Sequence, residues 1–173
     1  MMRLRVIRSV LLILTVVVLQ HSILDGVQFF GVHLDLPLLL VICAGFSDGR
    51  ETGAIVGFIV GLTTDGFLLT PLGLSALVYS LIGYIAGQTE KGSLIGPWTI
   101  NAALASLLSA FGVVGYEIAS RLLGFGQLLQ IHLIKVVLVV AITNAVLSVI
   151  MVPLAKWAFV SKELSSRPPV IRR

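Results

Sequence analysis

The sequence predicts an all-α integral membrane protein with six transmembrane helices and both termini in the cytoplasm. Hydrophobic residues make up 57% of the 173 residues and charged residues only 12%, and the mean hydropathy is +1.07. A soluble domain carries about twice that share of charge, so most of this surface is expected to face lipid. The basic residues lie between apolar runs and at the two ends, a pattern that argues against nucleic acid as a partner.

The first apolar run extends from Val6 to about Leu24 and follows Arg3, Arg5 and Arg8. A secretory signal peptide also begins with basic residues, but its apolar part is shorter and ends at a cleavage site with small residues. Here the run has the length of a membrane span and continues into DGVQFFG. We therefore expect a retained first transmembrane helix.

Five further apolar segments follow: Leu36–Phe46, Gly53–Leu69, Pro71–Gln88, Trp98–Leu123 and Leu128–Phe159. The segment at 36–46 is short for a hydrocarbon layer about 30 Å thick. It must include Val32–Asp35, lie in a thinned bilayer or be re-entrant. The last two segments are long, which predicts tilted helices with a tight turn at Gly124 and Gly126.

Basic residues gather at both ends of the sequence: Arg3, Arg5 and Arg8 at the start, and Lys156, Lys162, Arg167, Arg172 and Arg173 near the end. The positive-inside rule places both ends in the cytoplasm, which requires an even number of crossings. Six crossings also place Arg50 and Lys91 in inner loops. Residues 1–160 are thus expected to form one domain, and the basic, proline-containing tail 161–173 is expected to be disordered.

The predicted third helix carries a stripe at four-residue intervals: Gly53, Gly57, Gly61 and Asp65. Such spacing places the residues on one helix face, where glycines allow another backbone to approach closely. The fourth helix carries two further glycines for this packing, Gly83 and Gly87. The stripe could form a lipid-facing groove for a partner, but packing on the fourth helix is favoured because sequential helices usually pack together.

Asp65 is a lone carboxylate in an apolar stretch, and the sequence around it predicts an outer hairpin. Pro71 suits the first turn of the fourth helix, which places Asp65, Gly66, Pro71 and Gly73 in that hairpin. The favoured role for Asp65 is a hydrogen bond to free amides at the start of the fourth helix, such as those of Leu72 or Gly73. Partner binding and ion coupling are the alternatives.

Three polar residues are expected inside or near the last two spans: Glu117, Lys135 and Asn144. Glu117 and Lys135 could face each other across the outer hairpin, as an interfacial or snorkelling pair. Asn144 lies near the middle of its span, so it should point inward and bond to another helix.

The sequence predicts no enzyme, no cofactor and no metal site. It contains no HExxH, P-loop or GxSxG motif. His21 and His33 lack the ligand spacing that a metal site needs, and the single cysteine, Cys43, cannot form an internal disulfide.

The stretch ETGAIVGFIVGLTTDGFLLTPLGLSALVYSLIGYIAGQ, preceded by a basic start and a first span, resembles the MreD family of bacterial rod-shape-determining membrane proteins. The best match runs from Arg50 to Gln88 and includes the glycine ladder, Asp65, Pro-Leu-Gly and the closing GYIAG. The resemblance implies an S-component-like bundle, similar in fold to the substrate-binding S-components of ECF vitamin transporters.

The resemblance further implies a non-catalytic scaffold of the cell-elongation complex in the bacterial inner membrane. Its expected partners are MreC, MreB, a SEDS-type glycosyltransferase and a penicillin-binding transpeptidase, and its basic ends could contact anionic lipids. The alternative is a substrate-binding subunit of a vitamin importer. S-components often carry an AxxxA face on the first helix, which VIRSVLLILTVVVLQ lacks. The scaffold is therefore favoured.

Overall fold

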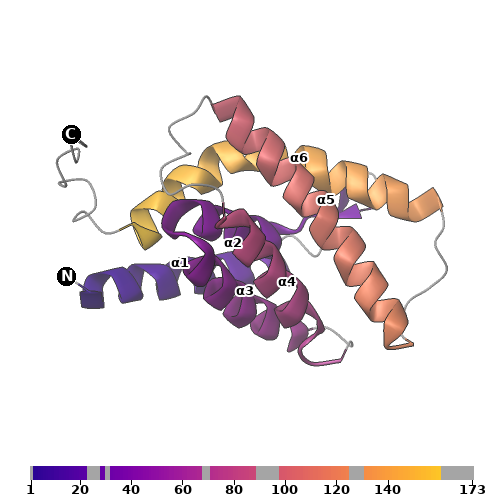
Figure 1. Cartoon of the computed structure of the whole chain (residues 1–173), viewed down its shortest axis with the longest axis horizontal. Helices are drawn as coiled ribbons and strands as arrows, with labels where there is room; N and C mark the ends of the chain where they lie inside the picture. The colour runs from indigo at the N-terminus through magenta and orange to yellow at the C-terminus, as the bar shows by residue number, and fades with distance from the viewer. Residues whose placement is uncertain are drawn as a thin grey trace, which may run out of the picture.

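A computed structural model describes residues 2–22, 28–29, 32–67, 71–88, 98–124 and 131–160. These residues form six helices and one short strand pair (Figure 1). The helices are α1 (Met2–Ser22), α2 (Leu36–Asp48), α3 (Arg50–Asp65), α4 (Leu74–Ala86), α5 (Trp98–Leu122) and α6 (Ile131–Phe159). Between α1 and α2, β1 (Gln28–Phe29) pairs antiparallel with β2 (Val32–His33). The predicted all-α class with six helices is confirmed, and the predicted tail 161–173 lies outside the described residues.

Three of the six helices, α1, α5 and α6, are long and apolar enough to cross a membrane on their own. The other three have 13, 16 and 13 residues, which corresponds to roughly 20–24 Å each. The suggestion that the second segment gains length from Val32–Asp35 is wrong, because α2 begins at Leu36. A strand and the N-cap residue, Asp35, occupy those positions.

Helix α2 forms the centre of the bundle, and all its residues from Leu36 to Phe46 are buried. Its sequence is apolar on every side, as expected for a helix surrounded by other helices. The remaining helices pack around it. Gly49 ends α2 with φ +96°, a backbone conformation that favours glycine. The chain reverses at this residue and enters α3 directly.

Both described ends of the chain lie at one end of the bundle, which we call the terminal end (Figure 1). There the Ser9 hydroxyl donates a hydrogen bond to the Ala158 carbonyl oxygen at 3.2 Å. The Arg8 guanidinium also lies 5.0 Å from the centre of the Trp157 ring. The six helices run alternately between this end and the opposite end, which we call the far end. This arrangement agrees with an even number of membrane crossings.

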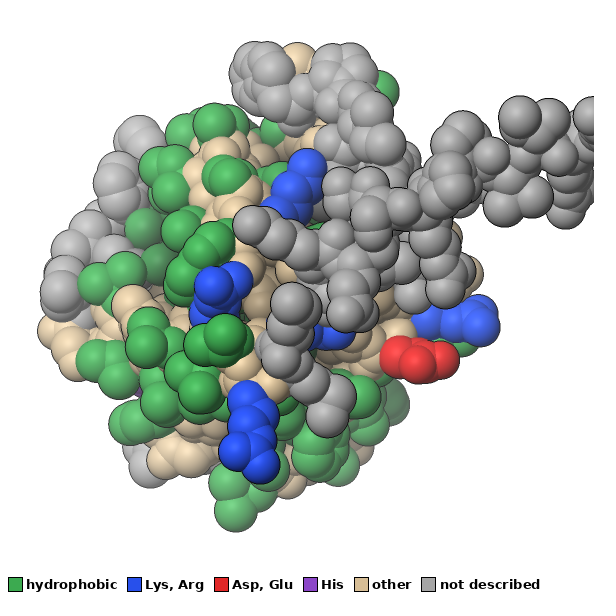
Figure 2. All heavy atoms as spheres, turned by 90° about the vertical axis from the view of Figure 1, so that its left-hand side faces the viewer, with side chains coloured by type: hydrophobic (Ala, Val, Ile, Leu, Met, Phe, Trp, Pro, Cys, Tyr) green, Lys and Arg blue, Asp and Glu red, His purple; other side chains and the backbone are tan. Residues whose placement is uncertain are grey.

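Lysine and arginine side chains group on the terminal end among apolar ones, as Figure 2 shows. Among the residues that the structure describes, the exposed basic ones at this end are Arg3, Arg8, Arg50 and Lys156. The positive-inside rule predicts that this end faces the cytoplasm.

Candidate functional site

The glycine stripe of α3 faces α4. A methyl group on Gly53 would lie 2.1 Å from the carbonyl oxygen of Gly83, and one on Gly57 would lie 2.4 Å from the carbonyl oxygen of Tyr79. One on Gly61 would lie 2.5 Å from the Cα of Ala76. The two backbones are therefore in direct contact, and we call this contact the glycine seam. The stripe is internal packing and does not form an open groove for a partner.

The seam extends to the terminal end of the bundle. A methyl group on Gly87 would lie 2.2 Å from the amide nitrogen of Arg50, and one on Gly45 of α2 would lie 2.6 Å from the Gly83 carbonyl oxygen. Gly45 was not among the predicted packing residues. Gly45 belongs to α2, and the chain reverses at Gly49 before α3 begins, so the four-residue interval of α3 does not extend to it.

Asp65 ends α3 at the far end of the bundle and caps α4. Its side chain is 1% exposed. Its Oδ2 accepts hydrogen bonds from the amides of Gly73 at 2.8 Å and Ala76 at 3.4 Å, and its Oδ1 accepts one from the amide of Ser75 at 3.0 Å. A helix start leaves such amides without partners inside the helix. The predicted bond to the Gly73 amide is present, and Ser75 and Ala76 take the place suggested for Leu72.

The start of α4 differs from the prediction. The helix begins at Leu74 rather than near Pro71, because Gly73 adopts a left-handed conformation with φ +102°. Gly73 occupies the N-cap position but has no side chain with which to cap. The carboxylate of Asp65, on the preceding helix, supplies the cap instead.

A second polar network lies at the far end of the bundle, around Asp35. Asp35 caps α2 by accepting from the Leu38 amide at 3.0 Å. The Tyr79 hydroxyl of α4 lies 3.0 Å from each carboxylate oxygen of Asp35. Asn144 of α6 donates to Ser109 Oγ of α5 at 2.9 Å and to the Asp35 carbonyl oxygen at 3.4 Å. The network thus joins four helices.

The inward orientation predicted for Asn144 is confirmed, since its side chain is fully buried and bonds to another helix. The roles of Asp35 and Tyr79 were not predicted. They are 44 positions apart in the sequence, and no local pattern links them.

Glu117 does not pair with Lys135. It accepts a hydrogen bond from Arg121 at 2.9 Å, one helical turn further along α5. A pair at this spacing is a common local contact on a helix surface. Lys135 is exposed on the first part of α6.

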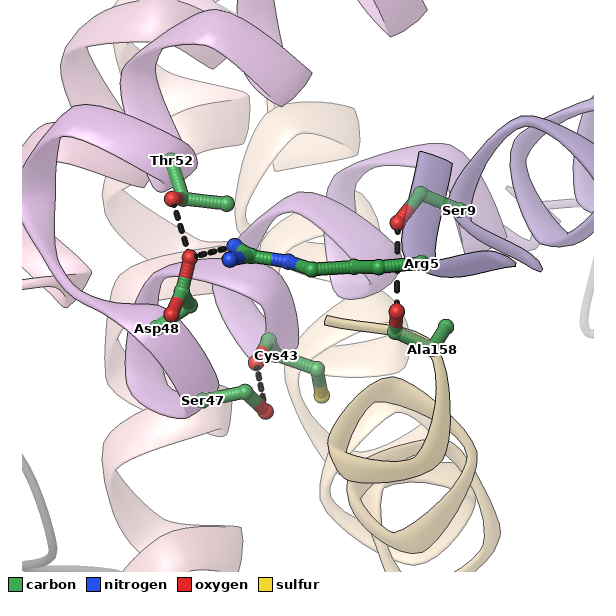
Figure 3. A network of polar contacts seen from close by, with 7 residues as sticks. All are labelled: Arg5, Ser9, Cys43, Ser47, Asp48, Thr52 and Ala158. Carbon is green, nitrogen blue, oxygen red and sulfur yellow. Dashed lines mark hydrogen bonds and ion pairs between the residues drawn. The ribbon is translucent and has the colours of Figure 1, made fainter. Parts of the chain in front are cut away.

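At the terminal end, α1 is held by a polar cluster shown in Figure 3. Arg5 forms an ion pair with Asp48 at the end of α2, and Thr52 of α3 donates to the same Asp48 oxygen at 2.5 Å. At the far end, Gln20 binds the backbone on either side of Asp35, through Leu34 and Leu36. Polar contacts therefore fix both ends of α1.

Replacing Arg5 with alanine is expected to lower the unfolding temperature in detergent. The Asp48 side chain is only 11% exposed, and it loses its charged partner. In a double-mutant cycle with Asp48→Ala, we expect a coupling energy of about 1 kcal/mol, as for partly exposed ion pairs. Arg3→Ala, at an exposed position of the same helix, is the matched control. Strictly additive effects of Arg5→Ala and Asp48→Ala would contradict the pairing.

Taken together, these polar groups hold helices in position. Both carboxylate oxygens of Asp65 and of Asp35 accept hydrogen bonds from the chain itself. Within the part of the chain that the structure describes, no group of three or more histidine, cysteine or acidic side chains could hold a metal ion.

Comparison with curated proteins gives no match. Comparison with solved structures also gives none, so the likeness to S-components stays a prediction. A family model for the rod shape-determining protein MreD matches residues 2–160, a range that takes in all six helices. The chain therefore belongs to the MreD family of rod-shape-determining proteins.

Proposed function

We propose that this protein is a non-catalytic scaffold of the bacterial cell-elongation complex. The family match and the three long apolar helices make it a rod-shape-determining membrane protein. The match over residues 2–160 is the observation that carries the proposal. The use of the buried acids as helix caps supports a structural role over a catalytic one.

The proposed location is the bacterial inner membrane, with six crossings and the terminal end in the cytoplasm. The exposed arginines at that end, Arg3, Arg8 and Arg50, support this orientation. They also suit contact with anionic lipid headgroups.

The proposed direct partner is an MreC-like single-span protein. MreB, a SEDS-type glycosyltransferase and a penicillin-binding transpeptidase would belong to the same complex and help to organise peptidoglycan synthesis. Because the glycine seam and Asp65 are buried, this partner must bind exposed residues. The family resemblance is most specific in the α3–α4 hairpin, so its exposed tip is the proposed contact.

The hairpin tip consists of Gly66, Phe67, Pro71 and Leu72 among the described residues. Phe67 and Leu72 are 61% and 75% exposed. The Phe67 ring stacks on His21 of α1, with 4.3 Å between ring centres, which fixes the tip against α1. An apolar tip held in this way suits a partner that crosses the membrane once and carries its domain on the outer side.

Affinity purification of the tagged protein from its native membrane tests the scaffold. We expect it to recover a single-span protein with a coiled-coil segment. Recovery of a pair of ATP-binding cassette proteins instead would overturn the proposal and favour the importer alternative.

Leu72→Ser is expected to reduce recovery of this partner several-fold, because it removes the most exposed apolar side chain among the described residues of the tip. Leu122→Ser is the matched control, since Leu122 is 83% exposed at the end of α5. Both variants should accumulate normally in the membrane, as neither side chain is buried. Full recovery with Leu72→Ser would exclude the tip as the contact while leaving the scaffold itself intact.

A further inference from the structure

The start of α1 and the end of α6 place a cation against an aromatic ring at the terminal end. The Arg8 guanidinium lies over the Trp157 ring, 5.0 Å from its centre, a distance typical of a cation–π contact. One residue further along each helix, the Ser9 hydroxyl donates to the Ala158 carbonyl oxygen (Figure 3). This bond ties the two helices together beside Arg8 and Trp157, which we call the Arg–Trp pair.

The Arg–Trp pair is accessible from outside the bundle. Arg8 is exposed, and Trp157 is 54% exposed. The ring covers one face of the guanidinium, whose N–H donors lie in the plane of the group and stay available to another partner. Arg5, three positions earlier, is engaged by Asp48. Among the residues that the structure describes, no acid pairs with Arg8, so its positive charge is not balanced within the described bundle.

Arg8 lies within the apolar surface of α1 and not at its edge. Leu4 and Leu11 stand on the same helix face, four residues before and three residues after it, and they are 59% and 58% exposed. Arg8 also stands five positions after Arg3, about 7.5 Å further along the axis of α1. In the membrane orientation proposed above, Arg8 therefore lies where acyl chains give way to headgroups. Tryptophan is enriched at this same level.

A cation at this depth needs an anion beside it. A charged side chain in the apolar part of a bilayer is costly unless it is paired or reaches the interface. Long basic side chains often extend toward water, but the Arg8 guanidinium lies over the Trp157 ring instead. The anion available at this level is the phosphate of a lipid. A guanidinium binds a phosphate through two parallel hydrogen bonds, and the cytoplasmic leaflet contains anionic lipids.

We propose that the Arg–Trp pair is a binding site for the phosphate of one anionic lipid in the cytoplasmic leaflet. Arg8 donates to the phosphate oxygens, and the Trp157 ring holds the guanidinium in place. Of the exposed arginines that the structure describes, Arg8 alone lies over an aromatic ring, so the site differs from general attraction to the basic end. The inference rests on the proposed function for its orientation, since it requires the terminal end to face the cytoplasm.

Native mass spectrometry of the purified protein in detergent tests the site, because it counts the lipids that the protein retains. The probe is palmitoyl-oleoyl phosphatidylglycerol, titrated against Arg8→Ala and Arg50→Ala. Arg50 is also exposed at the terminal end, so both variants lose the same charge. We expect Arg8→Ala to weaken binding of the first lipid about tenfold, as for the loss of a charge-assisted hydrogen bond. Arg50→Ala should have a much smaller effect. Equal weakening would overturn the site, since binding would then follow net charge alone.

Three further variants separate charge, planar geometry and the aromatic ring. Arg8→Lys keeps the charge but lacks the planar group that binds phosphate through two bonds, so it should bind the lipid several-fold more weakly. Trp157→Phe keeps a ring beside the guanidinium and should retain most of the affinity, whereas Trp157→Leu should not. Both positions are exposed, so unfolding temperatures without lipid should stay close to that of the unmodified protein. Unchanged lipid affinity in Trp157→Leu would contradict the proposed role of the ring.

Inorganic phosphate distinguishes a lipid from a soluble anion as the ligand. Even in large excess, it should not displace phosphatidylglycerol, because it lacks the acyl chains that hold the lipid at the depth of Arg8. Displacement would assign the site to a soluble anion and overturn the inference. Arg8→Ala should still recover the single-span partner from native membranes. Failure of the lipid site is therefore distinguishable from failure of the proposed scaffold.

Discussion

Alanine at Gly53 is expected to prevent the protein from accumulating in a folded form. The new methyl group would lie 2.1 Å from the carbonyl oxygen of Gly83. The obstacle is backbone, so no side chain can rotate away and the two helices must separate. Overpacking in a core typically costs about 1–3 kcal/mol, and a rigid obstacle places this variant at or above the upper value. Separation would also stretch the hydrogen bonds of Asp65 to α4.

Two other glycines provide matched controls for Gly53→Ala. A methyl group on Gly66 would lie 3.3 Å from the Thr63 carbonyl oxygen and 3.9 Å from that of Leu62, and one on Gly115 would lie 3.7 Å from a Val78 methyl group. Both substitutions should be tolerated. Membrane levels by immunoblot and unfolding temperature in detergent are the measurements. Equal unfolding temperatures for Gly53→Ala and Gly66→Ala would contradict the glycine seam.

The sequence predicts the members of the seam well because helix periodicity is local. Four-residue spacing places Gly53, Gly57 and Gly61 on one face in any helix. Which neighbour occupies that face depends on the turn between α3 and α4, and only the structure decides between α4 and a partner. The sequence also could not predict that α2 lies at the centre of the bundle, since a short apolar segment is equally consistent with a re-entrant, a spanning or a buried helix.

The polar contacts of the site also divide into local contacts, which the sequence predicts, and long-range contacts, which it does not. The capping role of Asp65 could be predicted because its partners follow within eleven positions. The bond between Asp35 and Tyr79 and the pair of Arg5 with Asp48 join residues more than forty positions apart. No spacing rule reaches that far. The partner of Glu117, by contrast, was available from the sequence, because Arg121 stands at the usual four-residue spacing.

Asp65→Ala is expected to destabilise the protein by about 3 kcal/mol or more. The substitution removes the acceptor for three amides at the start of α4, and each buried amide left without a partner costs about 1–3 kcal/mol. It also removes a negative charge from the N-terminus of a helix. The unfolding temperature and the amount of protein in the membrane should both fall. Glu51→Ala, which removes an exposed acid at the start of α3, is the control and should have a much smaller effect.

Asp65→Asn separates hydrogen bonding from charge at this corner. Asparagine keeps one oxygen, so it can still accept from part of the set formed by Gly73, Ser75 and Ala76. Its NH₂ group, however, must face an amide donor, and we expect a loss intermediate between those of aspartate and alanine. If Asn and Ala variants both reached normal membrane levels and both abolished cell-shape function completely, the cap would be an insufficient explanation. The negative charge itself would then be the required feature, and a cationic group of a partner would have to reach this buried corner.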